Sequence, residues 1–280
     1  MSGACYRAAM DREAIEPSAE RAVDVHAALA VHWLGRIDYR DAWALQKRLA
    51  AARAADRIGD QLLLLEHPAV LTLGRAADES HVLASPDELE SRGIELLRVE
   101  RGGEVTYHGP GQLVAYPILR LADRGFLLRP FVRALEGALS DTCAAFGVEA
   151  GRREGHPGCW VDPEGPLPRK IGALGLRVER GVTYHGIALN VSVDLSDFSL
   201  IDPCGMPGLT STSITSELGR RDEPPSTEGV ARAAAVFATA FAGRLEATLE
   251  GHLPPDADPD AERAAAERLA ASRPAEAGPA

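Results

Sequence analysis

The stretch that decides the fold is Arg169–Leu195, "RKIGALGLRVERGVTYHGIALNVSVDL". Two runs rich in aliphatic and β-branched residues lie on either side of the dipeptide Arg180-Gly181. Glycine adopts the positive φ angle that tight hairpin turns require. The pattern therefore predicts two long strands that pair as an antiparallel hairpin.

Strand and helix patterns alternate on both sides of this hairpin. The expected strands lie at 23–34, on both sides of Pro68 within 60–74, at 94–99 and at 113–119. The expected helices begin at Asp38, after the N-cap residue Ser85, near Pro130 and near Val230; the last two end at Gly147 and near Gly251. Together these elements predict a mixed α/β (α+β) fold, with a mixed β-sheet flanked by helices.

The domain is expected to span residues 23–250, because no linker-like stretch divides this range. Residues 1–22 are polar and acidic, and residues 251–280 are rich in proline, alanine and acidic side chains. Segments with few large apolar residues rarely bury enough surface to fold alone. Both are expected to be mobile tails.

Composition restricts the class of partner. The formal net charge of -11 argues against nucleic acid as the main partner, because phosphate binding needs clustered basic residues. No segment is apolar over the roughly 18 residues that a membrane span needs, and the acidic N-terminal stretch does not resemble a secretory signal. A cytoplasmic protein that is not bound to membranes is expected.

The four cysteines are scattered without a C-x-x-C pair, so no metal site is expected. Cys143 and Cys159 lie in apolar patterns and are interpreted as small buried residues. Cys204 is different, because "LIDPCGMPGL" places it between proline and glycine in a loop. Burial alone gives no reason for a cysteine there.

Lysine is rare in this chain: Lys47 and Lys170 are the only lysines among 30 basic residues. Unlike arginine, lysine can lose its proton when it is buried or close to another cation. Lys47 fits a solvated position on a helix. Lys170 stands next to Arg169 at the start of a strand, where a catalytic role and a structural role are equally compatible with the sequence.

The string VTYHG occurs twice, at 105–109 and 182–186, without similarity in the flanking residues. The match is too short to indicate a duplication. Each copy places Thr, Tyr and His beside glycines, where backbone can approach a ligand closely. We expect His108 and His185 to approach one pocket, with Lys170 and Cys204 at its floor; if they lie on opposite faces, the identity is chance.

Three motifs carry a family resemblance: "RGGEVTYHGPGQLVAYPIL", "RKIGALGLRVERGVTYHGIALN" and "FSLIDPCGMPGLTSTSI". In this order and spacing they resemble the signature regions of lipoyl(octanoyl) transferases of the LipB type. "YRDAWALQ" and "LLLLEHPAVLTLGR" are also similar to that family. The resemblance covers residues 30–245 and implies the fold of biotin and lipoate protein ligase catalytic domains.

The resemblance implies an acyltransferase that moves an octanoyl group from octanoyl-acyl carrier protein to a lysine of apo lipoyl domains, the first step of protein lipoylation. The implied acceptors are the lipoyl domains of 2-oxoacid dehydrogenases and the glycine cleavage H protein. The octanoyl group is carried on the phosphopantetheine of the carrier protein, so no cofactor of the enzyme's own is implied. A monomer is also implied.

The family's catalytic residues map onto two positions, Cys204 as the nucleophile that forms a thioester and Lys170 as its partner. The family's substrate-contacting stretches map onto Arg101, Gly102, Gly103, Glu104, Val105, Thr106, Tyr107, His108, Ala173, Leu174, Gly175, Gly186, Ile187 and Ala188. A neighbouring ammonium increases the reactive thiolate fraction of a cysteine. The amides of Gly205 and Met206 are candidates for stabilising the tetrahedral oxyanion.

Two further expectations concern substrate binding. Small residues of the two long strands should leave room for an apolar slot, namely Gly172, Ala173, Gly175, Gly186 and Ala188. Because carrier proteins and lipoyl domains are acidic, basic residues should gather at the site entrance. The candidates are Arg152, Arg153, Arg169, Arg177 and Arg180.

Three alternatives stay open. An ATP-dependent lipoate ligase of the same fold would use Lys170 without needing Cys204. A cysteine hydrolase would pair Cys204 with His108 or His185 and release octanoate to water. A non-catalytic module would bind acyl carrier protein, and its cysteine would be inert.

Overall fold

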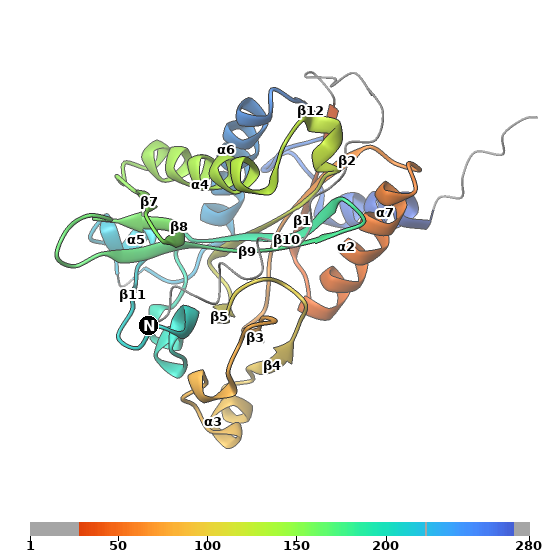
Figure 1. The fold of residues 1–280 in the computed structure, drawn as a ribbon. Coiled ribbons are helices and arrows are strands. Elements are labelled where there is room, and N and C mark those ends of the chain that lie inside the picture. Colours follow the sequence, from red (N-terminus) through yellow and green to blue (C-terminus); the bar gives the residue numbers. More distant parts are fainter. Residues whose placement is uncertain (1–27, 222, 272–280) are drawn as a thin grey trace, which may run out of the picture.

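The computed structural model describes residues 28–221 and 223–271 and forms a three-layer arrangement around a central sheet (Figure 1). The sheet has nine strands, in the order β12-β1-β2-β6-β10-β9-β8-β7, with β11 paired to β9. The strands are β1 (Ala28–Arg36), β2 (Asp60–Glu66), β6 (Gln112–Ile118), β7 (Gly151–Arg153), β8 (His156–Val161), β9 (Arg169–Glu179), β10 (Val182–Asn190), β11 (Thr210–Ser211) and β12 (Thr248–Glu250). Parallel and antiparallel pairs both occur, which confirms the expected mixed sheet.

The hairpin predicted from the sequence is β9–β10, in the interior of this sheet. Its register runs from Glu179 opposite Val182 to Gly172 opposite Leu189. Arg180 and Gly181 both have positive φ angles, 50° and 76°. Two successive positive φ angles give the turn a twist that matches the twist of the two strands. Lys170 therefore lies at the opposite end of β9 from the turn.

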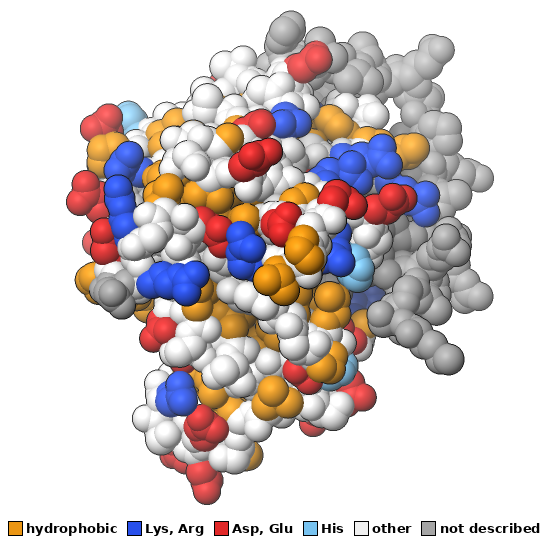
Figure 2. Space-filling view, turned by 90° about the vertical axis from the view of Figure 1, so that its left-hand side faces the viewer, with side chains coloured by type: hydrophobic (Ala, Val, Ile, Leu, Met, Phe, Trp, Pro, Cys, Tyr) orange, Lys and Arg blue, Asp and Glu red, His pale blue; other side chains and the backbone are white. Residues whose placement is uncertain are grey.

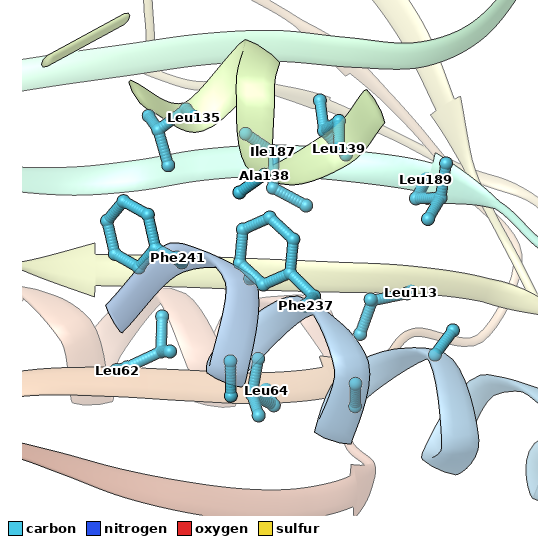
Figure 3. Packing of buried hydrophobic residues seen from close by; sticks show 14 of the residues in the cluster. Leu62, Leu64, Leu113, Leu135, Ala138, Leu139, Ile187, Leu189, Phe237 and Phe241 are labelled. Atoms are coloured by element: carbon cyan, nitrogen blue, oxygen red, sulfur yellow. The ribbon is translucent and has the colours of Figure 1, made fainter. Parts of the chain in front are cut away.

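Helices α4 (Leu128–Ala145) and α6 (Thr227–Leu245) cover one face of the sheet (Figure 1). Phe237 and Phe241 of α6 pack with leucines of β2 and β6, such as Leu62 and Leu64 (Figure 3). Side chains alternate between the two faces of a strand. The intervening Leu63 and Leu65 thus belong to the core on the other face. This is why "LLLL" is buried throughout its length.

The other face is covered by α2 (Tyr39–Ala54), by α7 (Pro259–Ala271) and by a small second sheet in the order β4-β3-β5 (Figure 1). Its strands are β3 (Val70–Leu73), β4 (Glu95–Arg98) and β5 (Val105–His108). The short helices are α3 (Pro86–Ser91) and α5 (Ile214–Glu217), with 3-10 turns η1 (Glu79–His81), η2 (Leu121–Arg124), η3 (Leu195–Leu200) and η4 (Pro203–Gly205). The small sheet has its own apolar cluster, which includes Leu200 and Ile201.

Helix ends follow the local chemistry that the sequence predicted. The side chain of Ser85 accepts a hydrogen bond from the amide of Glu88 at the start of α3. Gly147, with φ 81°, follows the end of α4. Helix α6 ends at Leu245, earlier than the expected end near Gly251, because Glu246 adopts a left-handed conformation and β12 follows. Among the described residues, no helix is long and apolar enough to cross a membrane.

The expected C-terminal boundary at residue 250 is wrong. Helix α7 belongs to the domain, since Ala266 and Ala270 are buried in the same core as α2. Glu262 accepts a hydrogen bond from Nδ1 of His32 at 2.9 Å, and Arg263 donates to the carbonyl of Leu34. Alanine is small enough to let a helix approach closely. Because its side chain is only weakly apolar, an alanine-rich segment does not show in the sequence that it packs against a core. Residues 1–27 and 272–280, including the expected N-terminal tail, lie outside the described residues.

The packing of α7 is testable with a matched pair of substitutions on one helix. Ala266→Asp would bury an unpaired carboxylate and should lower the free energy of unfolding by about 2–4 kcal/mol. Ala264→Asp places the same charge on an exposed position and should change it by less than about 0.5 kcal/mol. Urea denaturation measures both. Equal effects would contradict the packing of α7 against the domain.

Candidate active site

Lys170 and Cys204, 34 positions apart in sequence, meet on the face of the sheet that carries the small second sheet. Lys170 Nζ donates hydrogen bonds to Cys204 Sγ and to the carbonyl of Pro157, both at 3.1 Å. The same ammonium lies 5.0 Å from the ring centroid of Trp160, at a distance typical of cation–π contacts. The lysine side chain is nearly buried, whereas Cys204 is partly exposed. A thiol that receives a hydrogen bond from a buried ammonium is suited to react as the thiolate.

Cys204 is held in a strained turn. Its φ and ψ are 60° and 21°, within η4, and Gly205 follows with φ 64°. A left-handed conformation is uncommon for residues other than glycine and is found disproportionately at functional sites. The turn is anchored by the amide of Asp202, which donates to the carbonyl of His81 at 2.8 Å.

Gly205 is packed beneath a pair of side chains that the sequence motifs did not connect. A Cβ atom at Gly205 would lie 2.9 Å from His81 Cε1 and 3.2 Å from Glu104 Cγ. His81 Nδ1 donates to Glu104 Oε2 at 3.2 Å. Glu104 was expected at the site, but His81 was missed, because it lies in a loop outside the three motifs. Only the fold brings it to the cysteine turn.

The amides expected to stabilise an oxyanion are already occupied. Gly205 N–H donates to the carbonyl of Asp202 at 3.0 Å, and Met206 N–H donates to the carbonyl of Pro203 at 3.2 Å. Both bonds close the turn that positions the thiol. The expectation was wrong because amide direction depends on backbone angles, which the string "PCGM" does not reveal.

A buried chain of amide hydrogen bonds holds the elements around the site together. His108 Nδ1 lies 2.7 Å from Gln112 Oε1, and Gln112 Nε2 donates to Asn190 Oδ1 at 2.9 Å. Asn190 Nδ2 in turn donates to the carbonyl of Thr212, whose own amide donates to the carbonyl of Lys170. The chain links β5, β6 and β10 to the backbone of the lysine. Because Gln112 Nε2 is a donor, Gln112 Oε1 faces the ring and His108 carries its proton on Nδ1.

A small pocket adjoins Cys204, with a volume of about 20 Å³. It is lined by Thr106, Gln112, Lys170, Gly172, Ala173, Asn190, Phe198, Pro203, Cys204 and Ser211. A void of this size holds about one water molecule. Of the small residues expected to leave an apolar slot, only Gly172 and Ala173 reach it.

Gly175 and Gly186 serve a different purpose from the one expected. A Cβ atom at Gly175 would lie 2.9 Å from the carbonyl oxygen of Gly102, and one at Gly186 would lie 2.0 Å from that of Ala115. These glycines let neighbouring backbone approach, as in the hydrogen bond from the amide of Gly102 to the carbonyl of Leu176. Ala188 packs in the α2-side core, not in the pocket.

The other expected substrate-contacting residues are distributed over the two faces of the sheet. Arg101 is buried and donates to both oxygens of Thr72. Leu174 and Ile187 contribute their side chains to the core under α4 and α6, on the far face from Cys204. Val105 and Tyr107 lie in the core of the small sheet. Gly103 has φ 90°, a conformation that favours glycine.

The two VTYHG copies lie near each other and do different work. His185 contacts the ring of Tyr116, whereas His108 contacts the rings of Tyr39 and His67. The charge of Arg101 acts on both histidines. Neither histidine is hydrogen-bonded to Cys204 among the described residues; Lys170 is the side chain that bonds this thiol. Thr106 lines the cysteine pocket, whereas Thr183 bonds the backbone of Pro117. The two copies thus lie near each other but make different contacts.

The five expected arginines do not form one cluster. Arg153 does lie near Lys170, because its guanidinium is 5.4 Å and the lysine Nζ is 5.0 Å from the centroid of the Trp160 ring. A strand rises about 3.3 Å per residue, so Arg177 and Arg180 lie roughly 23 and 33 Å along β9 from Lys170. Arg169 is engaged by Glu217 through two hydrogen bonds, and Arg152 by Glu136. On the face that Figure 2 presents, basic and acidic side chains lie beside one another rather than gathering by sign. No group of three or more histidine, cysteine or acidic residues that could hold a metal ion occurs in the described ranges.

Three histidines near the site are held neutral by burial. Burial lowers the pKa of His67 to about 4, and burial together with Arg101 and Lys47 lowers the pKa of His185 to about 3. The pKa of His108 is also far below its usual range, chiefly through burial and then through His67 and Arg101. Nδ1 and Nε2 of His185 have no hydrogen-bond partner among the described residues.

These shifts predict how stability depends on pH. Between pH 6.5 and 5 the unfolded chain protonates these histidines while the folded protein does not, so stability should fall as pH falls. The expected slope is up to about 1.4 kcal/mol per pH unit for each histidine. His185→Asn, which tolerates the observed φ of 56°, should make the slope shallower. Urea midpoints at several pH values measure this, and equal slopes in the variant and the unchanged protein would contradict it.

Comparison with known proteins agrees with this arrangement. Residues 38–238 match the family model described as "Lipoyl protein ligase A/B catalytic domain". A protein from Acidobacterium capsulatum named "Octanoyltransferase" is 51% identical over 202 residues, covering 69% of this chain and 81% of that protein. A protein of the same name from Chloroflexus aggregans is 46% identical over 214 residues, covering 76% and 95%.

Solved structures show the same fold at low sequence identity. A putative lipoate protein ligase from T. acidophilum superposes with a TM-score of 0.59 at 17% identity, covering 88% of this chain and 92% of that one. A lipoate-protein ligase A bound with ATP gives a TM-score of 0.56 at 18% identity, covering 88% and 94%. The expected likeness to lipoate ligase domains is therefore confirmed at the level of the fold. With the family model matching most of the domain and relatives near half identity, this chain belongs to the lipoyl protein ligase A/B catalytic-domain family.

Proposed function

We propose that this protein is an octanoyltransferase that moves an octanoyl group from a thioester donor to a lysine side chain of lipoyl domains. The observation that carries the proposal is the 3.1 Å contact between Lys170 Nζ and Cys204 Sγ, in a chain whose relatives are named "Octanoyltransferase". The proposed donor is octanoyl-acyl carrier protein. The proposed acceptors are lipoyl domains of 2-oxoacid dehydrogenases and the glycine cleavage H protein.

In the proposed first step, the Cys204 thiolate attacks the carbonyl carbon of the donor thioester. The bond from carbon to the donor sulfur breaks, and the new thioester to Cys204 forms. Lys170, which donates its hydrogen bond to the sulfur in the resting enzyme, gives a proton to the departing thiolate. One thioester replaces another, so the step needs no ATP.

In the proposed second step, the neutral amine of the acceptor lysine attacks the acyl-enzyme. The amide bond forms, Cys204 leaves as a thiolate, and the surplus proton of the amine passes to Lys170. This proton replaces the one lost in the first step, so the resting pair is restored. The carbonyl of Pro157 and the face of Trp160 hold the Lys170 head group in position for both transfers.

The binding roles proposed for the remaining family positions follow from their places in the fold. The segment from Arg101 to His108 runs beside the cysteine turn, through Glu104 and Thr106. On β9, Ala173 lines the cysteine pocket, and Gly175 admits the backbone of Gly102. We propose that this face of the sheet receives the acyl chain. The protein is proposed to act as a monomer.

The other reactions that the sequence left open receive less support. A Cys–His hydrolase needs a histidine in contact with the thiol, but His108 is bonded to Gln112, and Cys204 is bonded by Lys170. An ATP-dependent ligase would leave the lysine–thiol contact without a purpose. The relatives near half identity carry the name of a transferase, which also argues against a non-catalytic binding module.

One experiment separates these reactions. On incubation with octanoyl-acyl carrier protein, intact mass spectrometry should show one octanoyl group on Cys204, and an apo lipoyl domain should discharge it without ATP. Cys204→Ser should abolish transfer. Lys170→Arg keeps the charge but cannot cycle a proton, so transfer should fall by at least about a hundredfold. Lys47→Arg is the matched control and should retain activity, because Lys47 lies on the surface beside Trp43 and Glu100.

Several outcomes would contradict the proposal. Near-normal transfer by Lys170→Arg would refute the proton-transfer role of the lysine. Loss of the octanoyl group to water at the same rate with and without the lipoyl domain would indicate a hydrolase. A strict requirement for ATP with no adduct on Cys204 would indicate a ligase.

The position of Lys170 should depend on a neighbouring glycine. A Cβ atom at Gly158 would lie 2.9 Å from Lys170 Cε and 2.5 Å from the carbonyl oxygen of Gly172. Gly158→Ala should therefore displace the lysine and reduce transfer by at least about tenfold, since overpacking a tight site typically costs about 1–3 kcal/mol. Gly155→Ala is the control, because Gly155 also has a positive φ but has no atom within 4 Å of the added Cβ. The rates of single-turnover transfer measure both, and equal losses would attribute the effect to backbone strain alone.

A further inference from the structure

A second, larger cavity lies beside the cysteine pocket, with a volume of about 520 Å³. Half of the residues that line it are serine or threonine, and Arg169 and Arg221 contribute positive charge. The volume is within the range of small-molecule sites in proteins. The hydroxyls of Ser192, Thr212, Ser213 and Thr215 are already hydrogen-bonded within the protein. Those of Ser196, Thr210 and Ser211 remain as partners for a ligand with many amide groups.

The cavity and the cysteine pocket share a wall. Ser211 of β11 lines both, and the chain continues from Ser211 in the pocket to Thr212 and Ser213 in the cavity. β10 does the same, since Asn190 lines the pocket and Ser192, just beyond the strand, lines the cavity. A ligand lying in the cavity would therefore have one end close to Cys204.

The charge of the cavity is uneven. Arg169 donates two hydrogen bonds to the carboxylate of Glu217, and the carboxylate of Asp194 accepts a hydrogen bond from the amide of Ser196. Arg221 is exposed at the rim and has no hydrogen-bond partner among the described residues. Glu217 interacts electrostatically with Arg221, but both of its carboxylate oxygens already accept hydrogen bonds from Arg169. Glu223, which lines the cavity, has its Oε1 atom 3.9 Å from Nε of Arg220. The rim thus has one guanidinium available for an anion, and guanidinium groups bind phosphate oxygens well.

We infer that this cavity binds the 4′-phosphopantetheine arm of the acyl donor, with the phosphate at Arg221, the amides along the serine and threonine hydroxyls, and the thioester at Cys204. The inference rests on the proposed function, because it requires a thioester donor. The same arm occurs in acyl carrier protein and in coenzyme A. The cavity would recognise the arm itself. Contacts with the rest of the donor would decide whether acyl carrier protein or coenzyme A supplies it.

The test compares four octanoyl donors with the full-length enzyme: octanoyl-acyl carrier protein, octanoyl-coenzyme A, octanoyl-4′-phosphopantetheine and octanoyl-pantetheine without phosphate. The rate of Cys204 octanoylation at subsaturating donor is followed by intact mass. Arg221→Gln should lower this rate about tenfold with octanoyl-acyl carrier protein and octanoyl-4′-phosphopantetheine, and less than about twofold with octanoyl-pantetheine. Arg220→Gln, the adjacent control outside the cavity lining, should leave all four rates unchanged. Loss that is equal with and without the phosphate, or no loss, would overturn the inference.

A second pair of variants tests the path of the arm. Ser196 lines the cavity, whereas Ser199, on the same 3-10 turn, does not. Ser196→Trp should fill the cavity and slow octanoylation by the pantetheine donors at least about tenfold, without slowing alkylation of Cys204 by iodoacetamide. Ser199→Trp should slow neither reaction. Unimpaired octanoylation in Ser196→Trp would overturn the proposed path.

Failure of the inference and failure of the proposed function give different results. If wild-type Cys204 accepts octanoyl from no donor, the proposed function fails. Calorimetric binding of unacylated 4′-phosphopantetheine then decides the cavity by itself: binding weakened by Arg221→Gln and not by Arg220→Gln supports the site, and no binding refutes it. Comparing wild-type rates for the protein-bound and coenzyme A donors identifies the source of the arm.

Discussion

The rest of the site depends on one contact, the hydrogen bond from Lys170 Nζ to Cys204 Sγ. Its two partners come from different kinds of structure, a long central strand and a strained turn. The lysine Nζ is also held by the carbonyl of Pro157, and the turn is held by the carbonyl of His81. A charged amine buried this deeply needs several partners, because desolvation of an unpaired ammonium is costly. The thiol, the carbonyl and the Trp160 ring together meet that need.

The polar groups behind this contact form hydrogen bonds with one another and with the backbone, not with the thiol. His108 is neutral and fixed by Gln112, which is itself saturated by Tyr107 and Asn190. A buried amide network is rigid when every member is satisfied, and costly when one is not. The network therefore supports the backbone of Lys170 without competing for the thiol. His185 is the exception, with an unusual φ and with ring nitrogens that have no partner in the described part of the chain.

The sequence alone predicts the features that depend on neighbouring residues, and fails for those that depend on contacts between distant residues or on exact backbone angles. The β9–β10 hairpin, the double burial of Leu62–Leu65 and the singular position of Cys204 follow from local patterns, and they hold. Helix α7 was missed because alanine carries little apolar signal even where it fits a narrow gap. The amide directions at Gly205 and Met206 were wrong because they depend on two dihedral angles. Arg177 and Arg180 were wrongly expected near the site, because an extended strand places residues only seven and ten positions from Lys170 far away from it.

The pocket beside Cys204 also constrains how an acyl chain can bind. Its volume of about 20 Å³ suits one water molecule, so eight carbons can enter only if a lining group moves. Lys170, Gln112 and Asn190 are held by hydrogen bonds, and Gly172 lies within a central strand pair. Phe198 differs from them, because the 3-10 turn η3 carries it and an edge-to-face contact with Tyr107, at 5.5 Å between ring centroids, holds its ring. Such a contact is worth only about 0.5–1.5 kcal/mol beyond the burial of area. Displacement of Phe198 therefore costs less than rupture of the polar network, and the acyl chain itself would restore the buried apolar surface. Movement of this one ring would therefore enlarge the pocket without breaking the hydrogen bonds that hold Lys170, Gln112 and Asn190.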